Sequence, residues 1–171
     1  MNKRVKIYEA KDGEDNAMNI EGITIRCFEQ NDRLLVEAFF QQMGGESRAF
    51  FDRADGNSGN ALGFFDGKDT HVIRWMALYE GRMVGYVFLW DLDKMIPWLG
   101  IGVAEDLKGK HLGRQLMQTA SDYVKTQGMG GILLTTHVAN LRGQGLYERC
   151  GYERMGMHSS GETLYLLRFK G

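Results

Sequence analysis

The sequence predicts an α/β protein with a mixed β-sheet covered by helices on both faces. Two observations predict this class. Short apolar runs occur in pairs joined by tight turns, which indicates antiparallel hairpins. Other apolar runs alternate with amphipathic segments of helical period, which indicates strand–helix–strand units. The 171 residues suffice for one domain with a sizeable core, and no repeat or linker divides residues 1–171.

The first third of the chain begins with a polar stretch, residues 1–21, whose alternating piece is either an extra edge strand or a mobile arm. A strand is expected at 23–28. A helix follows with Asn31 or Asp32 as N-cap and ends at Gly44 and Gly45. A short second helix at 46–53 and a turn-rich loop at 54–60 come next.

The rest of the chain alternates strands and helices. The expected strands are 71–80, 83–90, 96–103, 132–138, 152–158 and 163–170, and the expected helices are 112–127 and 140–150. The total is a central sheet of six to seven strands flanked by about four helices.

Composition and charge exclude several classes of function. The net charge is −1, which gives no broad surface for nucleic acid or membrane. No apolar run approaches the ~20 residues of a membrane span, and the basic start lacks a signal-peptide core. Cys27 and Cys150 lie far apart without a metal-ligand spacing. The sequence therefore predicts a cytoplasmic protein with free thiols and no metal.

The segment 103–114 joins a strand to a helix through a basic, glycine-containing turn. Free backbone N–H groups at a helix start and the helix dipole favour an anion, most often a phosphate. Four cationic or ionisable side chains surround this point: Lys108, Lys110, His111 and Arg114. An ordinary solvated connection is the alternative that the turn alone leaves open.

Two motifs resemble those of the GCN5-related N-acetyltransferases (GNAT). The turn 108–113 is similar to the family's acyl-CoA diphosphate loop, which follows a strand ending in valine, as Val103 does here. Downstream, Asn140 stands seven residues before Tyr147, and the segment 146–152 is similar to the second family signature. The resemblance implies a GNAT-like acyl-CoA N-acyltransferase fold from about residue 22 to the C-terminus.

The resemblance also implies the residues of a site for acetyl-CoA, the expected cosubstrate. Backbone N–H groups of the turn and the Lys108 and Arg114 side chains would hold the diphosphate. The strand end would hydrogen-bond the pantetheine chain, and Asn140 would bind it, cap its helix, or do both. The expected cofactor-binding residues are Ile101, Gly102, Val103, Lys108, Gly109, Lys110, His111, Leu112, Gly113, Arg114, Asn140 and Tyr147.

Three residues depart from the family's loop pattern. Lys108 stands where arginine or glutamine is usual, and a lysine can still meet a phosphate as a point charge. His111 stands in place of the central glycine, so a Cβ lies where the backbone should approach the diphosphate. Glu105 stands where proline is frequent, and its carboxylate would oppose an anion modestly. The sequence leaves two alternatives for His111: its imidazole joins the diphosphate site, or its Cβ obstructs it.

Tyr147 is the expected general acid for the leaving thiolate, at the family's position and with a phenol pKa near 10. The base is less defined, because the expected strand 96–103 has no acidic residue. His137, at the end of the next strand, is the best-placed substitute. Asp91 and Asp93 acting through water, or no single base, are the alternatives.

The predicted activity is acetyl transfer from acetyl-CoA to a primary amine by direct attack. The acceptor is a small molecule or a peptide, and a homodimer is compatible with the family. A non-catalytic CoA-binding or sensor module on the same fold is the main alternative, and a nucleotide-binding domain is disfavoured because the P-loop spacing is missing.

Overall fold

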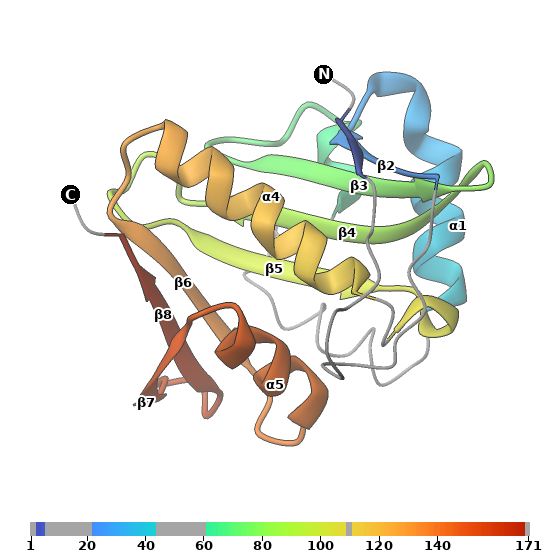
Figure 1. Ribbon diagram of the computed structural model, residues 1–171. Helices are drawn as coiled ribbons and strands as arrows, with labels where there is room; N and C mark the ends of the chain where they lie inside the picture. The colour runs from blue at the N-terminus through green and yellow to red at the C-terminus, as the bar shows by residue number, and fades with distance from the viewer. Residues whose placement is uncertain (1–2, 6–21, 44–60, 109–110, 170–171) are drawn as a thin grey trace.

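The structure is a computed structural model that describes residues 3–5, 22–43, 61–108 and 111–169 (Figure 1). The expected helix 46–53, the loop 54–60, and Gly109 and Lys110 lie outside the described residues. Within the described residues one sheet has the order β1-β2-β3-β4-β5-β6-β8-β7. Its strands are β1 (Lys3–Val5), β2 (Ile23–Cys27), β3 (Ile73–Tyr79), β4 (Arg82–Trp90), β5 (Trp98–Val103), β6 (Gly131–Thr136), β7 (Glu153–Met157) and β8 (Thr163–Arg168).

The sheet is mixed, because β5 and β6 run parallel while the other neighbouring strands run antiparallel. The predicted α/β class with a mixed sheet is confirmed. In the polar N-terminal stretch, β1 is a short edge strand that pairs with β2. With β1 the sheet has eight strands rather than the expected six to seven. A strand of three residues is too short to show a periodicity in the sequence.

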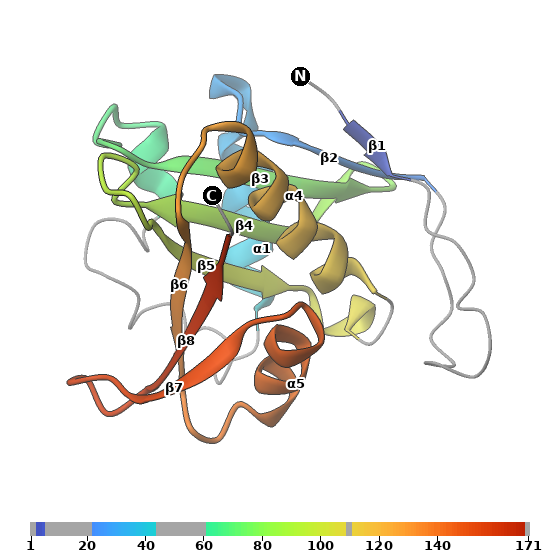
Figure 2. The ribbon, with the colours of Figure 1, turned by 60° about the vertical axis from the view of Figure 1, so that its left-hand side comes forward.

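The described α-helices cover opposite faces of the sheet: α1 (Arg33–Gln42) on one side and α4 (Leu112–Thr126) on the other (Figures 1 and 2). The third, α5 (Leu141–Arg149), lies beside β6 and β7. Successive side chains of a strand point to opposite faces. Accordingly Val87 and Leu89 join the core cluster under α4, whereas Tyr86, Phe88 and Trp90 join the cluster under α1.

A close approach fixes α4 on the sheet. A Cβ at Gly85 of β4 would lie 2.8 Å from Leu116 Cδ1, so only glycine leaves room for this helix. Leu112, Leu116 and Val124 of α4 are fully buried on the same face. The apolar face predicted from the helical spacing is therefore the face that packs on the sheet. This packing fixes the position of the first turn of α4.

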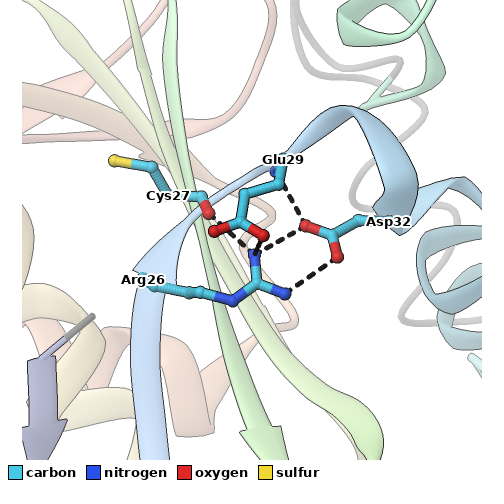
Figure 3. A network of polar contacts seen from close by, with 4 residues as sticks. All are labelled: Arg26, Cys27, Glu29 and Asp32. Carbon is cyan, nitrogen blue, oxygen red and sulfur yellow. Dashed lines mark hydrogen bonds and ion pairs between the residues drawn. The ribbon is translucent and has the colours of Figure 1, made fainter. Parts of the chain in front are cut away.

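A buried ion pair joins β2 to the start of α1 (Figure 3). Arg26 Nη1 and Nη2 donate to the two carboxylate oxygens of Asp32 at 2.6 and 2.8 Å. Asp32 stands at the N-cap position of α1, as the sequence predicts, but its side chain makes no bond to that helix. A two-pronged pair between a guanidinium and a carboxylate is stronger than a single bond from a backbone N–H to the same carboxylate, which explains the difference.

Candidate functional site

Strands β5 and β6 begin side by side and then part (Figure 1). In the described residues they share a single paired position, Trp98 with Leu133. Just before it, the Leu133 N–H donates to the Pro97 carbonyl at 2.9 Å, and the Gly130 N–H donates to the Met95 carbonyl at 2.8 Å. The pairing thus ends near the start of both strands, and their C-terminal halves leave two sheet edges facing each other.

The exposed edge of β5 belongs to Ile101 and Val103. The Ala104 N–H donates to the Val84 carbonyl of β4 at 2.8 Å. Because backbone groups alternate along a strand, Gly102 also faces β4, with which it pairs through Tyr86. Ile101 and Val103 therefore direct their N–H and C=O groups toward β6. Of the three predicted strand residues, these two present backbone groups to the opening, and Gly102 does not.

The N-terminus of α4 lies just beyond the end of β5. Its N-cap is His111, which makes no side-chain cap bond, and its first turn has no acidic residue. The N–H groups at the start of a helix have no partner within it and carry the positive end of the dipole. Leu112 is buried, so its contribution to a site is its backbone N–H rather than its side chain. This helix end is suited to an anion.

His111 has φ 65°, in the left-handed region that favours glycine. The family pattern has glycine at this position, so backbone conformation explains the glycine at least as well as close approach to a ligand does. The resemblance of the loop to the family pattern did not reveal this φ angle. Histidine is among the few other residues enriched in this region.

The charged side chains of the loop are only partly directed at an anion. Lys108 Nζ forms an ion pair with Glu105 Oε1 at 2.8 Å, so these residues neutralise each other. Arg114, in the first turn of α4, is exposed. Gly109 and Lys110 lie outside the described residues. An incoming anion could bind the exposed Arg114 directly. To bind Lys108 it would have to replace Glu105 as the partner of the ammonium group.

The first turn of α4 contacts α5. A Cβ at Gly113 would lie 3.0 Å from Leu146 Cδ2, so glycine permits the two helices to approach here. The predicted loop and the second signature therefore lie next to each other, although more than 25 residues separate Gly113 from Asn140 in the sequence.

The N-terminus of α5 is closed by its own residue. Asn140 Oδ1 accepts a hydrogen bond from the Gly143 N–H at 3.1 Å, and Asn140 Nδ2 donates to Thr136 Oγ1 at 3.0 Å. A Cβ at Gly143 would lie 2.4 Å from Asn140 Nδ2. The close neighbour of Gly143 is therefore the cap itself, and Asn140 has the capping role.

Tyr147 lies on α5 with its ring packed against Tyr165, at 5.8 Å between centroids, and Tyr152, at 6.2 Å. It is buried. Burial raises the pKa of its phenol well above the ordinary value, and a hydrogen bond with the Thr136 side chain opposes this rise only in part. The phenol therefore stays protonated at neutral pH. Thr136 hydrogen-bonds to both Asn140 and Tyr147. Its inward position was visible in the sequence, because Thr136 lies on the same face of β6 as the apolar Ile132 and Leu134.

His137 follows directly on β6. Its Nδ1 accepts a hydrogen bond from the Ala139 N–H at 3.1 Å. A neutral imidazole has one acceptor nitrogen, and here the backbone uses it. Taking a proton from a substrate would require this turn to open. Asp91 and Asp93 lie in the loop between β4 and β5, at the end of β5 where the strands are paired rather than parted.

None of the described helices is long and apolar enough to cross a bilayer. In the same described part of the chain, no three His, Cys, Asp or Glu side chains gather in a group that could hold a metal ion.

Comparisons with known proteins agree with this geometry. Residues 29–152 match the acetyltransferase (GNAT) family. No curated protein sequence matches the chain. Among solved structures, a domain from Methanocaldococcus jannaschii has 22% identity and a TM-score of 0.70, covering 86% of this chain and 98% of that chain.

Two further structures have the same fold at low identity. The PaiA N-acetyltransferase from Thermoplasma acidophilum, in complex with coenzyme A, has 13% identity and a TM-score of 0.70 over 86% of this chain and 99% of that chain. The ribosomal-protein-S5-alanine acetyltransferase from Vibrio fischeri has 13% identity and a TM-score of 0.71 over 90% and 95%. With well over half of its length matched by the family, this chain belongs to the GNAT acetyltransferases.

Proposed function

We propose that the protein is an acetyl-CoA-dependent N-acetyltransferase in which a primary amine attacks the thioester directly. The observation that carries the proposal is the uncapped N-terminus of α4 beside the unpaired edge of β5. The helix start suits a diphosphate, and the strand edge suits a chain that contains amide groups. The two follow each other in the polypeptide, since β5 leads into α4. Coenzyme A has both parts, and family membership supports it as the ligand.

The residues present fit such a donor. The first-turn N–H groups of α4 and the Arg114 guanidinium would hold the diphosphate. The backbone groups of Ile101 and Val103 would pair with the pantetheine amides as a neighbouring strand does. An N–H from the same edge would donate to the thioester carbonyl and stabilise the negative charge that develops on its oxygen. Asn140 would keep α5 in place rather than contact the donor.

The donor supplies an activated acetyl group, and the chain supplies orientation and proton transfer. The amine nitrogen forms a bond to the carbonyl carbon while the carbon–sulfur bond breaks. The Tyr147 phenol would give its proton to the departing sulfur, and the amine loses a proton, so charge balances over the reaction. His137 is the base expected from the sequence, but its Nδ1 lone pair is turned to the Ala139 N–H.

Isothermal titration of acetyl-CoA into the protein tests the proposal, followed by measurement of thiol release in the presence of primary amines. We expect saturable binding at micromolar concentrations and amine-dependent thiol release. Absence of heat at high micromolar acetyl-CoA would refute the proposal. Binding without release across a broad amine panel would instead favour a CoA-binding sensor, the alternative suggested by the absence of a carboxylate on β5 (Trp98–Val103).

A further inference from the structure

The hairpin between β7 and β8 brings a carboxylate to the C-terminal end of β6, which is the end where β5 and β6 have parted. Thr135 Oγ1 donates to Glu162 Oε1 at 3.0 Å. Glu162 is half-buried, and among the described residues no lysine or arginine forms an ion pair with it. A partly desolvated carboxylate with one neutral donor is an effective receptor for a cation.

The turn that carries Glu162 is well fixed. The His158 N–H donates to the Glu162 carbonyl at 2.7 Å, and the Gly161 N–H donates to the His158 carbonyl at 2.9 Å. The Glu162 N–H donates to Ser160 Oγ at 3.3 Å. His158 Nδ1 also accepts from the Ser160 N–H at 3.1 Å. The carboxylate is therefore presented from a closed turn rather than from a free loop.

Glu162 faces the side of the sheet that α4 leaves open. On β6, Ile132 and Leu134 lie in the core under α4, so Thr135 points to the opposite face. A donor held at the α4 N-terminus approaches from the α4 side, which leaves the opposite face for the acceptor. Glu162 directly precedes Thr163, which pairs with Thr136 of β6, and Thr136 is the residue that hydrogen-bonds to Asn140 and Tyr147, so the carboxylate lies near the proposed chemistry.

An aromatic wall ends at the same hairpin. Phe88, Trp90 and Trp98 stack in succession on the α1 face, with centroids 5.3 and 6.2 Å apart. The Trp98 ring then meets the His158 ring edge-on at 5.7 Å. Trp98 and His158 are both half-buried. Phe88 and Trp90 are buried, so the accessible part of this wall is Trp98 with His158, and the backbone hydrogen bond of the turn joins His158 to Glu162. A half-buried indole near a carboxylate suits an ammonium group on an apolar body.

We infer that Glu162 binds the acceptor as an ammonium ion and takes its first proton, with Trp98 and His158 holding the apolar part of the same acceptor. This inference rests on the proposed acetyltransferase function and names its acceptor class: primary alkylamines with an apolar or aromatic body. In the step assigned to Glu162, an N–H bond of the ammonium breaks, its proton passes to the carboxylate, and the freed electron pair on nitrogen attacks the thioester carbon. The carbon–sulfur bond then breaks, the sulfur takes the Tyr147 proton, and the second proton lost by the nitrogen restores the phenol. Thr135 acts as a positioning residue.

The test compares Glu162→Gln with the wild type, using phenethylamine and n-butylamine as acceptors and thiol release as readout. We expect kcat/KM to fall by about 100-fold or more for both amines, the effect typical of losing a general base. The matched control is Glu153→Gln, because Glu153 is an exposed glutamate on β7 of the same hairpin. Calorimetry with acetyl-CoA should give the wild-type affinity for both variants.

Thr135 gives a second variant. Thr135→Val leaves the carboxylate but removes its donor, so we expect about a 10-fold rise in KM for phenethylamine, and Thr135→Ser should restore the wild-type value. The inference fails if Glu162→Gln keeps wild-type kcat/KM, if Glu153→Gln loses as much, or if the wild type binds acetyl-CoA yet acetylates neither amine. Failure to bind acetyl-CoA would refute the proposed function instead, so the two failures are distinguishable.

Discussion

The two helices that meet at the candidate site begin in opposite ways. At α4 the side chain of the N-cap His111 makes no cap bond to the helix, and the first turn has no acidic residue. At α5 the N-cap Asn140 accepts from the Gly143 N–H and donates to Thr136. The first backbone N–H groups of each helix have no partner within that helix. At α5 the Asn140 side chain accepts from one of them, whereas at α4 the N-cap side chain accepts from none, so the α4 start is suited to an external partner.

The difference suggests a division of labour between binding and chemistry. An uncapped helix start lacks the ~1 kcal/mol that a cap contributes, which a bound anion can replace. A capped helix start is independent of ligand and keeps its side chains in one place. Tyr147 is on that second helix, packed between Tyr152 and Tyr165. Substitutions in α4 should therefore change affinity, and substitutions in α5 should change turnover or stability.

The largest effect is expected for Tyr147→Phe. Removing the phenol removes the proton proposed for the leaving sulfur, so kcat should fall by about 10²- to 10⁴-fold. The acetyl-CoA dissociation constant should change by less than about twofold, because the ring still fills its place in the core. Steady-state thiol release and calorimetry measure the two quantities.

Tyr152→Phe is the matched control, a buried tyrosine in the same cluster with no proposed part in the chemistry. Because burial raises the pKa of Tyr147, its phenol should also produce no alkaline fall in turnover below about pH 10. Unchanged kcat in Tyr147→Phe would remove this residue as the acid and leave α5 a structural helix.

The next largest effect is expected for Arg114→Glu, which places an acidic residue in the first turn of α4. A carboxylate there would satisfy the helix start and repel a diphosphate, so acetyl-CoA should bind about 10- to 100-fold more weakly. Thermal stability should not fall. Arg149→Glu, an exposed charge reversal at the other end of α5, should leave the affinity unchanged. Equal losses from both variants would indicate a general charge effect rather than a site at α4.

The sequence was sufficient to locate these two helix starts but not to tell them apart. Periodicity identified α4 and α5, and the motifs identified the residues around them, because local spacing determines both. Whether Asn140 caps or binds depended on Gly143 and Thr136, which approach it only in the folded chain. The left-handed φ of His111 and the parting of β5 from β6 also arise from tertiary packing.

The position of the proposed base was equally beyond reach of the sequence. Asp91, Asp93 and His137 were the candidates because they lie next to the relevant strands in the sequence. Glu162 reaches β6 through the antiparallel pairing of β8, in which Leu164 stands opposite Thr135. A register of this kind cannot be read from a single sequence, since a shift of one residue would turn Glu162 to the other face.

A sign reversal tests the closed start of α5. Gly143→Ala adds helix propensity of about 1 kcal/mol. Its Cβ would nevertheless lie 2.4 Å from Asn140 Nδ2. Displacing the cap costs up to about 2 kcal/mol, which outweighs the gain, so we expect the free energy of unfolding to fall by up to about 1 kcal/mol. In an Asn140→Ala background the same substitution should raise it, because the obstacle has gone. Urea denaturation of the four proteins measures the cycle, and Gly145→Ala, with only an ordinary contact at 3.6 Å, should stabilise in both backgrounds. Additive effects at Gly143 would mean that Asn140 does not cap α5 in solution.

The smallest effect concerns His111 at the open start of α4. A left-handed residue costs about 1 kcal/mol unless it is glycine. His111→Gly removes that cost but adds chain entropy in the unfolded state, so the net gain in unfolding free energy should stay below about 1 kcal/mol. His111→Asn, which keeps a Cβ and also tolerates this conformation, is the control and should be near neutral.

If the backbone N–H groups bind the diphosphate, His111→Gly should bind acetyl-CoA as tightly as the wild type or up to a few-fold more tightly, since the Cβ no longer limits approach. Weaker binding in both variants would mean that the imidazole itself contacts the ligand, and the start of α4 would then be a side-chain site as well as a backbone one.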